Sequence, residues 1–325
     1  MRVLLPLAPA ADTFTENVAV TLRSMGHEVA TPRVPRVGWH RTRIGRAISA
    51  ALSGPLTDAP TRAERRLVRL ARSFHPDLLL SLTAGLHPEV LDVIGRMCGR
   101  RRVLWWGDAP ANSRRWGMLE PRWDAVYLKD PAAVAKLCLV GRNAHLLHEA
   151  MNPMWHRPIA AQTNEDIALV GNSYAFRQAI CLRLMERGTP LAIYGPRPPR
   201  WSNPAFRSAH SGRYVVKEEK SRVFGEALAC LNTFSLAEGD SLNCRAFEIA
   251  GAGGLQLIED RPSIRECFEP GKELLAFSTF EELMAHTERA RKDPAAMSAI
   301  REAGARRALA EHTYRHRLER ILKAL

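Results

Sequence analysis

The sequence has no long apolar run. None approaches the roughly 18 residues that a membrane-spanning helix needs. The apolar start, MRVLLPLAPAADTF, carries one basic residue and continues directly into a helical pattern, so it is unlike a secretory signal. We therefore expect a soluble, cytoplasmic protein whose first residues form a strand and a loop.

Cysteine is scarce and follows no pattern. The chain has six cysteines, none of them in a C-x-x-C pair, and most lie in apolar stretches. Disulfide frameworks and structural zinc sites need paired cysteines at short, regular spacings. We expect buried free thiols instead.

Acidic residues are outnumbered: 34 Asp and Glu face 47 Lys and Arg, for a net charge of +13. The chain has no basic tail, no aromatic-interleaved RNA-binding signature and no zinc-finger spacing, which argues against nucleic acid as a partner. The excess charge suits phosphate-bearing ligands or peripheral contact with an anionic membrane at its inner face. The alternative is an arginine-rich codon usage without functional meaning.

At 325 residues the chain is long enough for two domains. Continuous apolar strands alternate with helical patterns in both halves, which predicts α/β domains with parallel sheets covered by helices on both faces. A polar, proline-containing stretch without periodicity, residues 151–166, predicts a linker. We place an N-terminal domain at 1–155 and a C-terminal domain at 156–325.

The most informative stretch is LNTFSLAEGDSLNCRAFEIAGAGGLQLIED, residues 231–260. A strand ends near Thr233, and Asp240 or Ser241 can cap the helix that follows. The N-terminus of that helix suits a pyrophosphate. Arg245 and Glu248 are three residues apart and share one helix face, so Arg245 can hold a phosphate and Glu248 a ribose diol.

This block resembles the donor-binding segment of GT-B glycosyltransferases, in which two acidic residues stand eight apart before a glycine-containing turn. Asp240 and Glu248 have that separation, with Asp at the first position. The run NCRAFEIAGAGG, followed by DRPSIRECFEPGKE and EHTYRHRL, is most similar to the spore-maturation-protein-like branch, with Gly251 where that pattern has Ala. The resemblance covers about residues 165–325 and implies two Rossmann-like, doubly wound domains facing a central cleft.

The resemblance also implies donor contacts from the loop in IALVGNSYAFR and from the end of the next predicted strand. In the C-terminal domain the last helix is expected to cross back to the first domain. The donor-binding candidates are Gly171, Asn172, Ser173, Arg177, Tyr194, Gly195, Asp240, Ser241, Leu242, Asn243, Arg245 and Glu248. Thr233 can complete this pocket.

In the first half, Asp108 follows the predicted strand of VLWWGDAP, at the sheet edge where ligands bind. Its carboxylate can act as general base toward an acceptor hydroxyl, and the alternative is a turn aspartate that caps the next segment. Trp105 and Trp106 are core residues, or one of them stacks on a sugar. The acceptor-side candidates are Thr13, Glu16, Trp106 and His148.

The predicted function is transfer of a hexosyl or related group from a nucleoside-diphosphate sugar to a glycan, lipid-linked or protein acceptor. No D-x-D motif stands out, so we predict metal-independent transfer in which Arg245 and helix N–H groups stabilise the leaving diphosphate. No cofactor is expected. The alternatives are a sugar-nucleotide epimerase or hydrolase on the same fold, and a non-catalytic binding protein.

Overall fold

The computed structural model describes residues 1–33, 59–99, 101–113, 116–159 and 163–325. The chain forms two compact units, Met1–Leu147 together with Leu325, and His148–Ala324. The predicted linker lies within the second unit, apart from residues 160–162, which are outside the described residues. The prediction that the last helix crosses back to the first domain stays a prediction.

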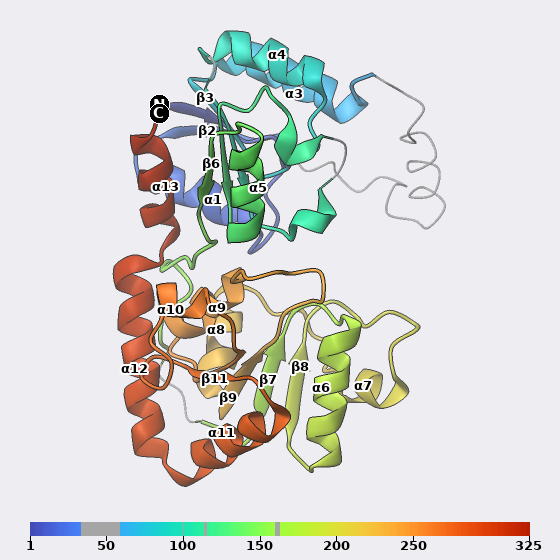
Figure 1. The fold of residues 1–325 in the computed structure, drawn as a ribbon, viewed down its shortest axis with the longest axis vertical. Helices are drawn as coiled ribbons and strands as arrows, with labels where there is room; N and C mark the ends of the chain where they lie inside the picture. The colour runs from blue at the N-terminus through green and yellow to red at the C-terminus, as the bar shows by residue number, and fades with distance from the viewer. Residues whose placement is uncertain (34–58, 100, 114–115, 160–162) are drawn as a thin grey trace. The chain divides into compact units, whose positions relative to one another are not determined.

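The first unit is built on a parallel sheet in the order β2-β1-β3-β4-β5-β6. Its strands are β1 (Arg2–Leu4), β2 (Glu28–Ala30), β3 (Leu78–Ser81), β4 (Arg102–Trp106), β5 (Ala125–Leu128) and β6 (Ala144–Leu146). Its helices are α1 (Phe14–Ser24), α3 (Arg62–Phe74), α4 (Pro88–Met97) and α5 (Pro131–Leu139), shown in Figure 1.

Alternate strand residues of this sheet face different helices. On one face, Leu79 and Leu104 pack with residues of α3, α4 and α5. On the other face, the ring of Trp105 meets Phe14 of α1 edge to face, with 4.8 Å between ring centroids. Covering both faces with helices explains why the central strands β3, β4 and β5 are mostly apolar.

The second unit has a parallel sheet in the order β11-β10-β9-β7-β8. Its strands are β7 (Ile167–Val170), β8 (Leu191–Tyr194), β9 (Ala229–Asn232), β10 (Gln256–Glu259) and β11 (Leu275–Phe277). Its helices are α6 (Ala175–Glu186), α7 (Pro204–Ala209), α8 (Lys217–Glu226), α9 (Cys244–Gly251), α10 (Ile264–Cys267), α11 (Phe280–Lys292), α12 (Pro294–Glu311) and α13 (Tyr314–Lys323).

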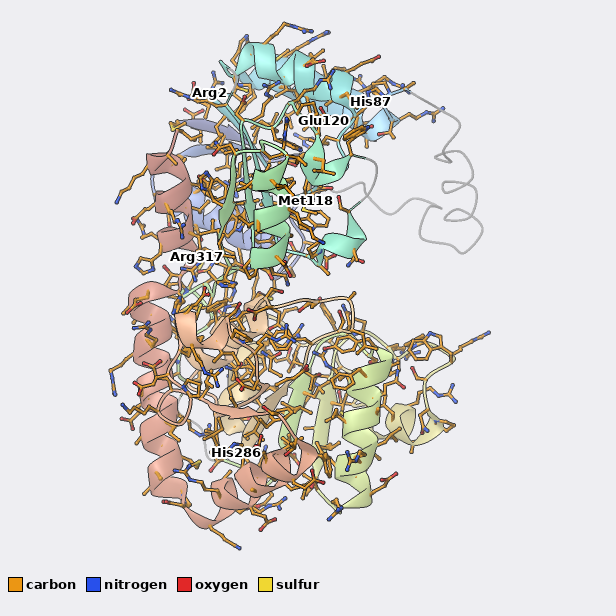
Figure 2. The ribbon with its side chains drawn as sticks, viewed as in Figure 1. Arg2, His87, Met118, Glu120, His286 and Arg317 are labelled. Carbon is orange, nitrogen blue, oxygen red and sulfur yellow. The ribbon has the colours of Figure 1, made fainter. Side chains whose placement is uncertain are left out.

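Strand β7 shows how this sheet is covered. Ile167 and Leu169 pack with α6, α7 and α11, whereas Ala168 and Val170 pack with α8 and α9. The side chain of His286 on α11 also contacts the backbone carbonyl of Ala276 in β11, 3.0 Å away (Figure 2). The sheets and their coverage confirm the predicted doubly wound α/β fold.

The end of the chain is tied to the start of the second unit by a short parallel bridge. The backbone N–H of Met151 donates to His312, and the N–H of Tyr314 donates to Met151. Arg317 on α13 reinforces the bridge by donating to the carbonyls of His148 and Glu149 at 3.2 and 3.3 Å. Arg317 is labelled in Figure 2.

Two smaller expectations concern membrane spans and thiols. Within the described residues, no helix combines the length and the apolar character needed to cross a bilayer. All six cysteines are free, as predicted; most are buried, but Cys138 is exposed and Cys244 is half-buried.

Candidate functional site

The N-terminus of α9 is fixed by Asn243, not by Asp240 or Ser241. The Asn243 side chain accepts a hydrogen bond from the N–H of Ala246, and the helix begins at Cys244. The predicted capping by Asp240 is wrong, because its carboxylate accepts the N–H of Ser263 at 3.0 Å instead. The Asp240 carbonyl also accepts the Ser263 hydroxyl, so this residue anchors the loop before the helix.

A buried amide network holds this helix start against the sheet. Asn232 at the end of β9 exchanges hydrogen bonds with Asn243 at 3.0 and 3.2 Å and donates to Gln256 of β10 at 3.2 Å. Gln256 in turn donates to the carbonyl of Ala246. The Asn243 side chain is therefore committed to positioning the helix, which leaves its backbone as the part that can face a ligand.

Two glycines bring the ends of β7 and β8 together. Gly171 and Gly195 have φ angles of +137° and +140°, which side-chain-bearing residues rarely adopt. The N–H of Gly171 donates to Tyr194, and a Cβ on Gly195 would overlap the carbonyl oxygen of Gly171. Both predicted loop glycines are thus needed for a close backbone approach at the carboxyl edge of the sheet.

Two arginine side chains converge on Gly171. A Cβ placed there would lie 2.7 Å from Nη2 of Arg245 and 3.1 Å from Nη1 of Arg177. Arg177 is buried, and burial together with the charge of Arg245 lowers its pKa to about 10. The side chain of Arg245 is half-buried and makes no hydrogen bond or ion pair with the described residues. The structure therefore concentrates positive charge beside the N-terminus of α9.

Arg177 is held in place by partners both near and far in the sequence. Its Nε and Nη2 donate to the hydroxyl and carbonyl of Thr233 at 3.1 and 2.8 Å, and its Nη1 donates to the carbonyl of Asn172 at 2.9 Å. The guanidinium stacks on the ring of Tyr174, whose hydroxyl donates to the carbonyl of Thr233. Burial raises the pKa of that phenol.

Sequence reasoning missed two residues of this cluster, Tyr174 and Glu238. The charge of Glu238 acts on Arg177 and raises its pKa, but more weakly than burial and Arg245 lower it. The only sequence signal for Tyr174 is its place three residues before Arg177, where a ring can stack on the guanidinium.

Glu248 lies on α9 one turn after Arg245 and is buried. Its carboxylate forms an ion pair with Lys220 of α8, with 2.9 Å between Nζ and Oε1. His156 has its Nε2 3.8 Å from the same oxygen. Sequence reasoning missed Lys220, because its partner is 28 positions away. The ribose role of Glu248 stays a prediction that has to be reconciled with this ion pair.

The other predicted donor residues have unequal surroundings. The hydroxyls of Ser173 and Ser241 are buried and have no hydrogen-bond partner among the described residues. The Leu242 side chain is fully buried with Phe234 and Phe247, so only its backbone can serve a donor. Tyr194 is partly buried at the end of β8 and packs against the core.

The comparisons with known proteins concern the family of the second unit and the fold of the chain. Residues 176–323 match a family described as glycosyl transferase-like. The computed structure resembles Anabaena Alr3699/HepE in complex with UDP-glucose, with a TM-score of 0.67, 10% identity and 100% of each chain covered. The chain has the GT-B fold. Searching curated protein sequences gives no match.

Two further GT-B structures cover nearly the whole chain. Sucrose-phosphate synthase from Thermosynechococcus elongatus has a TM-score of 0.66 at 14% identity and covers 100% of this chain and 98% of its own. AviGT4, a glycosyltransferase involved in avilamycin A biosynthesis, has a TM-score of 0.63 at 16% identity, with 99% and 96% covered. These likenesses establish the fold of both halves, whereas the family match covers the second unit alone.

In the first unit of this GT-B fold, Asp108 follows β4 and is exposed. Its carboxylate accepts the N–H of Ala109 at 2.8 Å, as in the turn interpretation, and its role as a base stays a prediction. Trp105 is a core residue, while Trp106 is partly buried and donates its indole N–H to the carbonyl of Ala109.

Thr13 and Glu16 together form the start of α1. The Thr13 hydroxyl accepts the N–H of Glu16, and the Glu16 carboxylate accepts the N–H of Asp12 at 2.6 Å. These bonds give both residues a capping role that sequence reasoning did not foresee. His148 belongs to the second unit, where it is buried, with its Nε2 4.0 Å from a carboxylate oxygen of Glu266. The acceptor roles of all three stay predictions.

Proposed function

We propose that the protein is a glycosyltransferase that uses a nucleoside-diphosphate sugar as donor and binds it on its second unit. The observation that carries the proposal is the convergence of Arg177 and Arg245 on Gly171, beside the N-terminus of α9. Two guanidinium groups and the first N–H groups of a helix suit the two negative charges of a diphosphate.

The proposed chemistry uses these groups on the leaving side. As the bond between the anomeric carbon and the diphosphate breaks, negative charge grows on the diphosphate oxygens. Donors that are already held in position stabilise that charge without first having to reorganise. Arg177 is fixed by Thr233 and Asn172, whereas Arg245 is available to the ligand.

The nature of the donor is also a proposal. Structures with this fold include one in complex with UDP-glucose and one with UDP and glucose. We infer that a uridine diphosphate sugar is the first donor to test. We also propose that transfer needs no metal and that the protein belongs to the spore-maturation-protein-like branch, on the strength of its NCRAFEIAGAGG, FEPGKE and EHTY segments.

Titration calorimetry with UDP, GDP, ADP and uridine tests the donor site. For the preferred diphosphate we expect Arg245→Gln to weaken binding by about tenfold to a hundredfold, because hydrogen bonds to charged groups contribute about 1.5–3 kcal/mol. Arg289→Gln, at an exposed arginine on α11, removes the same charge elsewhere and serves as the control.

Two outcomes would contradict the donor site. One is that no diphosphate binds to the wild type. The other is that Arg245→Gln weakens uridine as much as UDP, because uridine has no phosphate for the arginine to hold.

Catalysis needs a separate measurement. Release of UDP from UDP-sugars, followed with and without saccharide acceptors, separates transfer from donor hydrolysis. Asp108→Asn is expected to lower transfer by roughly a hundredfold while leaving UDP affinity unchanged, as for loss of a general base. Unchanged transfer would refute the base role of Asp108, and binding without any turnover would favour a non-catalytic protein.

A further inference from the structure

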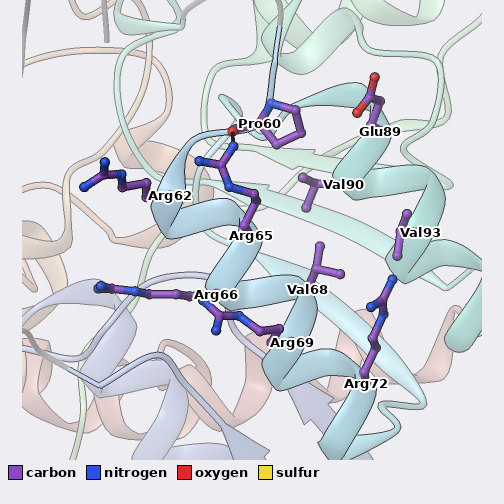
Figure 3. Close-up of a pocket in the computed structure, with 10 residues that line it drawn as sticks. All are labelled: Pro60, Arg62, Arg65, Arg66, Val68, Arg69, Arg72, Glu89, Val90 and Val93. Carbon is purple, nitrogen blue, oxygen red and sulfur yellow. Dashed lines mark hydrogen bonds between the residues drawn. The ribbon is translucent and has the colours of Figure 1, made fainter. Parts of the chain in front are cut away.

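A groove of about 470 Å³ lies between α3 and α4 of the first unit, and its described lining includes none of the predicted site residues. One wall is the arginine-rich side of α3, with Arg62, Arg65, Arg66, Arg69 and Arg72 (Figure 3). All five side chains are exposed. Figure 3 shows that Arg62, Arg66 and Arg69 extend to one side of α3, opposite the side on which Val90 and Val93 of α4 lie.

The positive charge of this groove is largely uncompensated. Among the described residues, Arg62, Arg66, Arg69 and Arg72 make no ion pair. Arg65 donates to the carbonyl of Pro60 at 2.6 Å, a neutral partner. The described lining contains a single carboxylate, that of Glu89. A cluster of like charges without acids is unfavourable for the protein alone and is relieved by an anionic ligand.

The helix that carries the arginines is rigidly placed. Its N-terminus has a full capping box between Thr61 and Glu64, and the second oxygen of Glu64 accepts the N–H of His87 at 2.7 Å, just before α4. On its inner side, Leu67 and Ala71 are buried in the core. The guanidinium groups therefore project from a fixed base, which lowers the entropic cost of ordering them around a ligand.

The spacing of the arginines suits an extended ligand. Arg62, Arg66 and Arg69 are four and three residues apart, which places their Cα atoms about 6 and 4.5 Å apart along the helix axis. Each guanidinium can hold a carboxylate, sulfate or phosphate with two hydrogen bonds. A row of such groups matches a chain that carries an anion on successive units better than a single small anion.

The rest of the lining distinguishes among polyanions. The apolar residues are Val68, Val90 and Val93, and Val90 is buried while the other two are half-buried. They do not protrude as a bilayer anchor must. The described lining has no aromatic side chain on which a nucleic-acid base can stack.

We propose that the arginine face of α3, at the rim of the α3–α4 groove, binds an anionic glycan chain through Arg62, Arg66 and Arg69. Binding itself does not need catalysis. Its role as the subsite that holds an anionic acceptor rests on the proposed glycosyl transfer, and it would make the acceptor a saccharide that carries carboxylate, sulfate or phosphate groups.

The test compares two triple variants of equal charge. The groove variant replaces the three proposed binding arginines: Arg62→Gln/Arg66→Gln/Arg69→Gln. The control variant replaces three exposed arginines of the second unit: Arg187→Gln/Arg289→Gln/Arg306→Gln. Binding of a heparin octasaccharide at 150 mM salt is measured by calorimetry. We expect the groove variant to lose about tenfold to thirtyfold in affinity and the control no more than about twofold, since exposed ion pairs contribute less than 1 kcal/mol each.

Other probes and a third variant make the outcome decisive. A neutral dextran octasaccharide should not bind. Equal losses in both triple variants would overturn the proposal, and so would stronger binding of single-stranded DNA or of phosphatidylglycerol vesicles through the same arginines. Arg245→Gln should bind UDP more weakly and heparin as the wild type does, whereas the groove variant should bind heparin more weakly and UDP as the wild type does. A failure of the groove proposal and a failure of the donor-site proposal therefore give different results.

Discussion

Replacing Lys220 by methionine removes the ammonium group that lies 2.9 Å from the Glu248 carboxylate. The side chains of both residues are almost fully buried, with exposed fractions of 9% and 4%. Their mutual attraction is therefore little screened, and the carboxylate left behind loses a partner in a place where water cannot replace it. Breaking a buried ion pair from one side typically costs about 3–5 kcal/mol of folding stability.

A double variant separates the pair from the rest of the core. Lys220→Met/Glu248→Leu removes both charges and keeps apolar volume, and replacing a buried pair in this way is often close to neutral. We expect the free energy of unfolding of the double variant to lie within about 2 kcal/mol of the wild-type value and well above that of the Lys220→Met variant. Urea unfolding at pH 7 measures all three proteins.

The matched control is Arg213→Met, which breaks an exposed pair with Glu219. It should cost less than about 1 kcal/mol. Two results would contradict this prediction: Lys220→Met costs no more stability than the control, or the double variant is no more stable than Lys220→Met. Either result would mean that the close contact between Lys220 and Glu248 does not couple them energetically.

The same variants decide what Glu248 does. If its second oxygen holds the ribose diol, Glu248→Gln should bind UDP more weakly and lose the preference for UDP over 2′-deoxy-UDP. If the carboxylate serves only Lys220, the preference should be unchanged in Glu248→Gln. Calorimetry with the two nucleotides gives the answer independently of any sugar transfer.

Three other predictions concern the donor loop, pH and metal. Gly195→Ala should destabilise the protein by at least 2 kcal/mol more than Gly188→Ala in urea unfolding, because a Cβ at Gly195 overlaps Gly171 whereas none meets Gly188; equal costs would refute the close approach. Burial and Arg317 lower the pKa of His312 to about 3, so the unfolded chain takes up the proton first and stability is lost as pH falls below about 6.5. Between pH 7 and pH 5 we expect the wild type to lose about 2 kcal/mol more folding stability than His312→Gln. The control variant His145→Gln should still lose this additional stability. Any UDP-sugar turnover should survive EDTA, and its loss with recovery by added Mg²⁺ would refute metal independence.

Local patterns in the sequence predict the elements well where tertiary contacts agree with them. The sequence pattern predicts helices at 88–97 and 280–292, and α4 and α11 have those bounds in the structure. A cap at Ser241 predicts a helix that begins at Leu242, two residues before α9 begins at Cys244. Asp240 and Ser241 are residue types that often cap helices. However, the Asp240 carboxylate accepts a hydrogen bond from Ser263, and the hydrogen bonds between Asn232 and Asn243 favour Asn243 as the cap.

The candidate site was predictable only in part, for a physical reason. Arg245 and the two loop glycines could be predicted from the sequence, because they stand at the ends of predicted strands and at the start of a predicted helix. The contacts that fix Arg177 come from Thr233, 56 residues later, and the partner of Glu248 is Lys220 on another helix. Periodicity carries no information on such pairings, because they depend on how the helices pack against the sheet.

The arrangement of Arg177 and Arg245 is costly for folding. Arg177 loses hydration by burial and is repelled by Arg245, and both effects lower its pKa, while Glu238 compensates weakly. A core optimised for stability would have an acid or an apolar side chain in place of one of these two arginines. Local choices that oppose the folded state are expected where a ligand completes the interactions. A diphosphate between the two guanidinium groups would turn their repulsion into shared attraction, and for this reason the donor site is more persuasive as a pair of arginines than as a glycine-rich loop.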